Sequence, residues 1–396
     1  MKNLKEGVVV SGVGIVTPLK PFMKVDDFWN ALCSGEDAIK RMSLPMLDTG
    51  RKWLMAGIDQ SSFADDISLE NKLQFIAEKA LCMAMKDANL RECQNAGLSI
   101  GTVLGNVLVK EKRLIESKKQ KTIYDYERES LSYVTSYLAA KYNLNGPSIT
   151  ISTACASGTD AIGIAARKIM AGKADLMIAG GIDVLSDFAI IGFHILQAIT
   201  EEKVRPFDKN RTGLAPGEGA AFVVLESEKH ASHRGAKVYG KVMGYASRAD
   251  ANHLTGPHRE GRGLADAMNQ AISEHNLKPR EINYINAHGT GTVYNDLMET
   301  KAIKKVFGKA AYDIPISSTK SMLGHSFGAA GAIEAICCLL SIKNKIVHPT
   351  INFNERDAEC DLDYVPNIAR HHIVNIAMSL SAGFGGQNSA IIFGKT

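Results

Sequence analysis

The sequence predicts a protein of the α/β class, in which buried strands alternate with helices. Short runs that are apolar and rich in β-branched residues recur along the chain, which is typical of buried strands. Amphipathic segments of helix length lie between several of them. This alternation favours mainly parallel or mixed sheets covered by helices. The expected strands are Val8–Val10, Leu98–Leu104, Ile149–Ser152, Leu176–Ala179, Ala220–Leu225, Ile282–Asn286, Ile314–Ser318, Asn375–Leu380 and Ser389–Phe393. The expected helices include Leu73–Ala88, Leu131–Lys141, Ala161–Ala171, Gly263–His275 and Asp296–Phe307.

The chain divides into two halves near a polar, glycine-punctuated segment, Arg234–Lys241. We therefore expect a first half over residues 1–233 and a second over residues 234–396. Each half contains a strand, a turn of small residues and then a helix, at Thr150–Gly163 and at Ser317–Leu340. This recurrence indicates a duplicated architecture.

Composition indicates a globular protein and argues against a nucleic-acid binder. Hydrophobic residues make up 45% of the chain and charged residues 22%, and the formal net charge is +4. The longest basic stretch, Lys110–Lys121, also contains Glu111 and Glu116. A nucleic-acid binder usually carries a concentrated basic stripe, so we expect this stretch to be a solvated helix face or loop.

Neither a membrane span nor a disulfide framework is expected. The longest apolar run, Gly328–Ile342, contains Glu334 and predicts a buried core helix. No apolar signal-peptide region precedes the strand at Val8–Val10. Seven cysteines, an odd number without a Cys-x-x-Cys pair, argue against disulfides and against a zinc ribbon. We therefore expect a reduced, cytoplasmic protein.

One cysteine lies where a nucleophile is expected. A β-branched strand that begins at Ile149 leads through small residues to Cys155, and further small residues up to Gly158 open a helix. A side chain at such a turn is exposed at the sheet edge, and the N-terminus of the helix behind it favours thiolate over thiol. A buried structural cysteine is the alternative, which we expect for Cys337 and Cys338 inside an apolar helix.

A second motif delivers a histidine into a loop of glycines and threonines. The strand in Tyr284–Thr292 is followed by His288, and Thr290 and Thr292 come next. Glycines let the backbone approach a ligand, and the threonine hydroxyls can form hydrogen bonds with an amide-bearing chain. The segment lacks the Gly-Lys-Ser/Thr ending of a phosphate loop. A histidine satisfied within the core is the alternative.

A third motif, Ser317–Gly331, combines Lys320 and His325 with small residues that start a buried helix. Glu334 lies on that helix, where an unpaired carboxylate would be costly to bury. We therefore predict that Lys320 is its partner. A metal site is not expected, because no carboxylate or second histidine lies at ligand spacing around His325.

The fourth motif, Ala382–Asn388, places glycines on both sides of Phe384 just before the last expected strand. Such a loop can supply backbone N–H groups to an oxyanion and can move an aromatic side chain. Taken alone, the motif fits an ordinary β-turn better.

In this order, the four motifs resemble those of the β-ketoacyl-acyl carrier protein synthases, the elongating condensing enzymes of type II fatty acid and polyketide synthesis. The similarity extends over essentially the whole chain. It includes Val10–Pro18, Ala179–Gly181, Phe207–Gly213, Gly217–Gly219 and Pro349–Asn352. The resemblance implies the thiolase-like fold, with two similar βαβ-rich halves forming a layered α-β-α-β-α core, and usually a homodimer.

The resemblance also implies roles for the motif residues. Cys155 matches the nucleophile that accepts the acyl group, and His288 and His325 match the paired histidines beside it. Lys320 matches the lysine that precedes the second histidine. Phe384 matches the gating phenylalanine, whose backbone N–H joins that of Cys155 in the oxyanion hole.

The implied substrates are acyl and malonyl groups carried on the phosphopantetheine of an acyl carrier protein. Thr290 and Thr292 match threonines that contact the pantetheine arm, and Gly383 and Gly385 belong to the loop expected to bind substrate. The implied reaction is a decarboxylative condensation that yields a 3-oxoacyl product, in fatty acid, aryl polyene or polyketide synthesis. It requires no metal, nicotinamide or flavin.

Some positions depart from the family pattern. Leu108 falls where the family places a residue that lines or gates the acyl pocket at the dimer interface, in a region without the usual glycines. This departure indicates a specialised pathway. Because carrier proteins are acidic, basic residues are expected near the pocket mouth, with Lys110, Lys112 and Arg113 as candidates.

Three other functions are weighed against this one. A chain-length-determining partner in a ketosynthase heterodimer shares the fold but lacks the nucleophile, whereas this chain retains Cys155. A thiolase needs a second catalytic cysteine near the C-terminal glycine loop, where Phe384 stands. A cysteine hydrolase fits less well, because two histidines and a lysine suit decarboxylation better than water activation.

Overall fold

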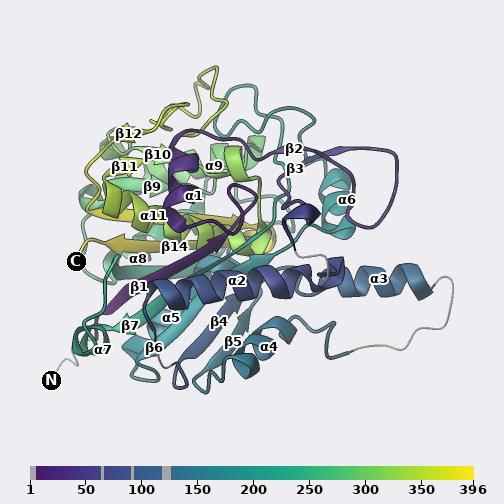
Figure 1. The fold of residues 1–396 in the computed structure, drawn as a ribbon. Helices are drawn as coiled ribbons and strands as arrows, with labels where there is room; N and C mark the ends of the chain where they lie inside the picture. The colour runs from purple at the N-terminus through teal and green to yellow at the C-terminus, as the bar shows by residue number, and fades with distance from the viewer. Residues whose placement is uncertain (1–5, 64–66, 91–92, 118–125) are drawn as a thin grey trace.

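A ten-stranded mixed sheet organises the chain and orders its strands as β10-β9-β13-β14-β8-β1-β7-β6-β4-β5 (Figure 1). The computed structural model describes residues 6–63, 67–90, 93–117 and 126–396. The strands of this sheet are β1 Val8–Val16, β4 Gly97–Gly101, β5 Ser148–Ile151, β6 Leu176–Asp183, β7 Gly219–Ser227, β8 Gly240–Ala249, β9 Tyr284–Asn286, β10 Ile316–Ser317, β13 Ile376–Gly383 and β14 Gln387–Gly394. Two hairpin-like pairs lie apart from it, β2 Lys40–Met42 with β3 Trp53–Met55, and β11 Ile346–Val347 with β12 Arg370–His371.

The two ends of the sheet repeat one topology. From the middle outward, the first half runs β1-β7-β6-β4-β5 and the second runs β8-β14-β13-β9-β10. In each, the first three strands pair antiparallel and the last three pair parallel. The halves join where β1 pairs antiparallel with β8. The sequence therefore encodes one supersecondary plan twice, as the recurrence of strand, small-residue turn and helix predicted.

Helices form three layers around the two halves of the sheet. The central layer holds α5 Ser157–Met170 and α11 Ala330–Asn344, each of which contacts strands of both halves. The helix α2 Lys72–Asp87 covers the outer face of the first half, and α8 Arg262–Ser273 covers that of the second (Figure 1). Separate apolar clusters seal the outer faces, and the largest cluster surrounds the central helices. This is the α-β-α-β-α arrangement that the resemblance implied.

The remaining helices flank these layers. They are α1 Val25–Cys33, α3 Val107–Ser117, α4 Tyr133–Lys141, α6 Asp187–Ile195, α7 Glu228–His233, α9 Val293–Phe307 and the short α10 Lys320–Leu323. Of these, α3 projects beyond the rest of the body (Figure 1). It contains residues 110–117 of the basic stretch 110–121, whose last four residues, 118–121, lie outside the described residues.

Most expected elements formed close to their predicted positions, but β8 was missed. The polar segment Arg234–Lys241 ends inside β8, whose glycines and polar residues hide its strand character. β1 and β6 also extend several residues past the apolar runs that predicted them. The division at residues 233 and 234 falls between α7 and β8, and as a domain boundary it stays a prediction.

One apolar helical stretch, Phe327–Asn344, is long enough to cross a membrane, but 89% of that window is buried inside the protein. It is the central helix α11 together with the turn before it. Cys337 and Cys338 are fully buried there, as the packing interpretation predicted.

Glycines let α5 and α11 approach each other closely at the centre. A Cβ added to Gly158 would lie 2.6 Å from the carbonyl oxygen of Gly328, and one added to Gly331 would lie 2.1 Å from Oγ1 of Thr159. Both distances are shorter than any real Cβ contact, so a side chain at either position would separate the two helices.

We expect Gly331→Ala to lower the free energy of unfolding by about 1–3 kcal/mol through overpacking. Gly192→Ala is the matched control, because Gly192 is also helical and a Cβ there meets nothing within 4 Å. The control should be neutral or up to ~1 kcal/mol more stable, since alanine favours the helix. Chemical denaturation of the two variants checks this, and equal stability would contradict the packing argument.

Candidate functional site

Cys155 lies on a strained turn between β5 and α5. Ala154, immediately before it, has φ +50°, a left-handed conformation that is uncommon for a residue with a side chain. Ser157 holds this turn: its hydroxyl donates to the carbonyl of Ala154 at 2.6 Å and accepts the N–H of Thr153 at 2.9 Å. Such strain persists only where the surrounding structure enforces it, which is common at functional sites.

His288 enters the same region from the end of β9. A carboxylate on α9 fixes its loop, because Glu299 accepts the backbone N–H of His288 at 2.6 Å and that of Gly289 at 2.8 Å. Glu299 is fully buried; burial raises the pKa of its carboxyl group, and the two backbone N–H bonds lower it. This residue was not among the predicted site residues, although an acidic residue on the helix after a glycine loop was a visible signal.

His325 and Lys320 come from the turn between β10 and α11. The ammonium group of Lys320 forms a buried ion pair with Glu334, which confirms the predicted partnership. Burial raises the pKa of the Glu334 carboxyl group to about 7, and the Lys320 charge opposes that rise. The side chain of Lys320 therefore stands behind the two imidazoles as a fixed cation.

Cys155, His288 and His325 converge on one point. The sulfur of the cysteine and a ring nitrogen of each histidine all lie within 4.8 Å of one another. The two imidazole rings are 5.2 Å apart between centroids and nearly perpendicular. Burial, followed by the nearby Lys320 charge, lowers the pKa of both histidines well below its ordinary value. Both rings are therefore neutral at physiological pH.

The thiol of Cys155 is also held in its neutral form. Burial raises its pKa to about 12, against the opposing effects of Lys320 and of a hydrogen bond from the Phe384 backbone N–H. We expected the helix N-terminus to favour the thiolate, which would lower the pKa of Cys155. The net shift of this pKa is upward, because desolvation outweighs the stabilising groups. Attack by this sulfur requires a base within reach, and the two neutral imidazoles meet that need.

Phe384 brings both a backbone donor and an aromatic ring to the site. Its N–H points at the sulfur of Cys155, and its ring stacks on Phe193 at 5.3 Å between centroids. Phe193 in turn contacts Phe327 at 5.7 Å. A Cβ on Gly383 would lie 2.9 Å from the backbone nitrogen of Cys155, so only glycine lets the loop approach this closely. Phe193 carried no sequence signal and was missed.

A cavity of about 420 Å³ opens onto these residues. Cys155, both histidines, Gly383 and Phe384 line it. Thr290 and Thr292 also line it, with their hydroxyl oxygens 2.8 Å apart. The cavity is large enough for a slender chain to reach the cysteine.

Several predicted site residues lie outside this lining. Lys320 stands behind the histidines, and Gly385 turns the loop at φ +79° while its N–H donates to the Leu254 carbonyl at 2.7 Å. Leu108 is buried at the start of α3 within the apolar cluster of the first half. Its role at a dimer interface stays a prediction.

The candidate carrier-binding residues also lie away from the lining. Lys112 pairs with Glu70, and Arg113 pairs with Glu129 at 2.6 Å. Lys110 is partly exposed on the same helix, α3. Their contact with a carrier protein stays a prediction.

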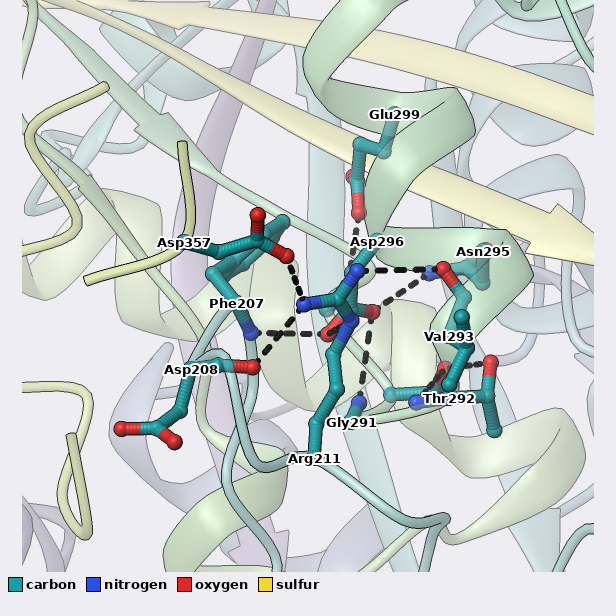
Figure 2. A network of polar contacts seen from close by, with 12 residues as sticks. Phe207, Asp208, Arg211, Gly291, Thr292, Val293, Asn295, Asp296, Glu299 and Asp357 are labelled. Carbon is teal, nitrogen blue, oxygen red and sulfur yellow. Dashed lines mark hydrogen bonds and ion pairs between the residues drawn. The ribbon is translucent and has the colours of Figure 1, made fainter. Parts of the chain in front are cut away.

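A buried polar network adjoins the threonine loop, as Figure 2 shows. Asp296 of α9 accepts the backbone N–H of Phe207 at 2.8 Å and that of Gly291 at 3.3 Å. Arg211 lies beside this carboxylate and donates to Asp357 at 2.5 Å. Asp296, with Arg211 of the run Phe207–Gly213 beside it, thus holds the loop that carries both threonines.

The three converging side chains offer one sulfur and two imidazole nitrogens, which is part of a zinc donor set. A structural or catalytic zinc site normally adds a fourth ligand or a water molecule. Among the described residues, no further histidine, cysteine or carboxylate joins the cluster. The expectation that the site needs no metal stays a prediction.

Comparison with known proteins gives consistent matches over the whole chain. Residues 5–231 match the Beta-ketoacyl synthase N-terminal domain, and residues 239–354 match the C-terminal domain. The chain is 36% identical to 3-oxoacyl-[acyl-carrier-protein] synthase 2 of Coxiella burnetii, with 99% of each protein covered. It is 34% identical to the tetracenomycin polyketide synthase ketoacyl synthase alpha subunit of Streptomyces glaucescens, covering 100% of this chain and 98% of that protein.

Solved structures also match over almost the whole chain. A type II polyketide ketosynthase in complex with its acyl-carrier protein, bound to the hexaketide, has a TM-score of 0.92 and 34% identity, with 99% of this chain and 100% of that chain covered. A ketosynthase in complex with its chain length factor from Xenorhabdus doucetiae has a TM-score of 0.86 and 29% identity, with both chains fully covered at 100%.

The raised pKa of Cys155 predicts its alkylation profile. We expect the rate of modification by iodoacetamide to rise about tenfold per pH unit from pH 7 to about pH 10, because only the thiolate reacts. Mass spectrometry of the Cys155 peptide follows the rate, with Cys155→Ala as the control for other cysteines. A plateau below about pH 8 would show that the thiolate is stabilised after all.

The buried ion pair predicts an asymmetry between single and double variants. We expect Glu334→Gln to destabilise the protein by about 3–5 kcal/mol, because it leaves Lys320 buried without a counter-charge. The double variant Lys320→Met with Glu334→Met should lose much less, since it buries no charge. Thermal unfolding checks this, and a double variant less stable than the single one would refute it.

Proposed function

This chain belongs to the β-ketoacyl synthase family, and from that premise we propose that Cys155 carries the acyl group during a decarboxylative condensation. The family membership makes the chain an acyl-transferring condensing enzyme. The observation that supports our assignment of residues is the convergence of one buried thiol, two neutral imidazoles and a backbone N–H in the lining of one cavity. The reaction has two halves, and each uses these groups differently.

In the first half, the sulfur of Cys155 attacks the thioester of an acyl group delivered by a carrier protein. The thiol proton passes to a neighbouring imidazole, and the carbonyl oxygen becomes an oxyanion. The backbone N–H groups of Phe384 and Cys155 stabilise that charge. The C–S bond to the carrier then breaks, and its leaving sulfur takes the proton, so the imidazole is neutral again.

In the second half, a malonyl thioester enters and loses carbon dioxide. The electrons of the broken C–C bond form an enolate, whose oxygen needs hydrogen-bond donors. The ring N–H groups of His288 and His325 can supply them, because both rings are neutral. The enolate carbon attacks the acyl-Cys155 thioester, which releases the 3-oxoacyl product on its carrier and a thiolate that takes up one proton.

Lys320 acts on this site through its charge. Its ammonium is buried and paired with Glu334, so it does not act as a nucleophile. Its charge lowers the pKa of both histidines and opposes the rise at Cys155. Both effects favour neutral imidazoles beside a thiol that can be deprotonated.

The partner of this site is an acyl carrier protein. A cavity of about 420 Å³ that Cys155 helps to line fits a phosphopantetheine arm, and Thr290 and Thr292 offer hydroxyls to its amides. We further propose that the chain works in the cytoplasm as a dimer, either with a second copy or with a homologous subunit, and that it needs no cofactor of its own. As a non-catalytic chain-length subunit it would have no use for Cys155.

The decisive experiment combines purified protein with a panel of acyl-carrier thioesters and malonyl-carrier protein. We expect an acyl adduct on Cys155 by mass spectrometry, followed by malonyl-dependent release of a 3-oxoacyl product. Cys155→Ala should lose the adduct, whereas Cys337→Ala, which removes a buried packing thiol, should keep it. The acyl group of the thioester that reacts fastest identifies the class of acyl chain that the enzyme extends.

An unmodified Cys155 and no product, even with a homologous partner subunit present, would refute the catalytic assignment. In that case the chain-length role would be the better explanation. Acylation without condensation would instead restrict the fault to the roles given to His288 and His325.

A further inference from the structure

Asp183 is a buried carboxylate of the first half that reaches into the second. It ends β6, a strand that contacts the central helix α11, and its side chain is fully buried. One carboxylate oxygen accepts the Thr102 hydroxyl at 2.8 Å and the Leu104 N–H at 3.0 Å. The other accepts the Val103 N–H at 2.8 Å and the Gly328 N–H at 2.7 Å. Of these donors, only Gly328 belongs to the second half.

The bond to Gly328 fixes the turn that follows His325. Phe327, just before Gly328, has φ +49°, a left-handed conformation that costs free energy for a phenylalanine. In this conformation its backbone N–H points back at Nδ1 of His325, at 3.3 Å. A backbone N–H can only donate, so Nδ1 of this neutral ring is the acceptor and the proton resides on Nε2. The tautomer of His325 therefore depends on the geometry of this turn.

The charge of Asp183 does not help the thiol. Its carboxylate, like that of Glu334, raises the pKa of Cys155, whereas the Lys320 charge and the Phe384 N–H lower it. The imidazoles of His288 and His325 also face the sulfur and are neutral. A neutral side chain at position 183 would leave the cysteine easier to ionise. The benefit of an aspartate here must therefore lie in the hydrogen bonds that its carboxylate accepts.

We propose that Asp183 is a positioning residue that sets the orientation and tautomer of His325 by holding Gly328, so that Nε2–H faces a substrate in the cavity. This inference rests on the proposed function, because that function gives the Nε2–H of His325 its task at the enolate. Asp183 touches neither substrate nor Cys155. It acts across the junction of the two halves.

An aspartate suits this place better than an amide would. Four donors surround it, and both carboxylate oxygens accept two bonds each. Asparagine offers a single acceptor oxygen, and its NH₂ group would face N–H groups that also donate. Asp183→Asn is therefore nearly isosteric, but it loses the hydrogen bonds at one of the two oxygens. These are either the bonds from Val103 and Gly328 or the bonds from Thr102 and Leu104.

The test compares the two half-reactions in Asp183→Asn. We expect transfer from acyl-enzyme to malonyl-carrier protein to slow by on the order of 10²-fold, because a donor misplaced by about 1 Å costs that much. Acylation of Cys155, which depends on the oxyanion hole, should change several-fold less. In the same variant Cys155 should be alkylated faster at each pH between 7 and 10, because a neighbouring negative charge is gone.

Asp187→Asn is the matched control. Asp187 is another buried aspartate after β6, and it accepts backbone N–H groups from Met46 and Leu47 at 3.1 and 2.8 Å. We expect it to affect stability without separating the two half-reactions. Equal losses in both half-reactions of Asp183→Asn, or an unchanged condensation rate, would overturn the proposal.

Two further measurements cover other outcomes. If Asp183→Asn does not fold, Thr102→Val removes one donor to the carboxylate isosterically and Thr102→Ser keeps it. Condensation should then slow in the valine variant alone, and equal rates would overturn the proposal. The alkylation shift needs no substrate, so it tests Asp183 even if the wild-type protein fails to condense, which would instead refute the proposed function. An alkylation rate that does not rise would contradict the charge argument.

Discussion

The close approach of α5 and α11 is the constraint on which the rest of the site depends. Glycines at positions 158 and 331 leave no room for a side chain between the helices, so the beginnings of both helices meet at the centre of the molecule. Each helix follows a strand of its own half, and the turn before each carries a catalytic candidate. Cys155 and His325 are therefore brought together by backbone packing.

Burial then decides the protonation of the site. Removing the thiol and both imidazoles from water favours their neutral forms, and the buried Lys320 charge strengthens that preference for the histidines. The paired Glu334 makes that cation tolerable inside the core. A site built this way offers hydrogen-bond donors without net charge on the rings, which suits a reaction that creates an enolate.

Buried carboxylates hold the catalytic loops by accepting backbone N–H groups. Glu299 does so for His288, Asp296 for the threonine loop and Asp183 for the turn after His325. Each lies behind the reacting groups, away from the cavity lining. Loops rich in glycine have little stiffness of their own, so rigid acceptors in the core supply the precision that the chemistry needs.

The sequence by itself determined the alternation of strands and helices, the two-fold recurrence and the four motifs that carry Cys155, His288, Lys320 and Phe384. These depend on local pattern, and even the Lys320–Glu334 pair followed from the cost of burying a lone charge. Only the tertiary structure decided the supporting residues and the sign of the Cys155 pKa shift. Asp183 is far along the chain from His325, so no local sequence pattern indicates its supporting role. Desolvation depends on everything packed around a group, so no local pattern indicates the sign of the Cys155 pKa shift.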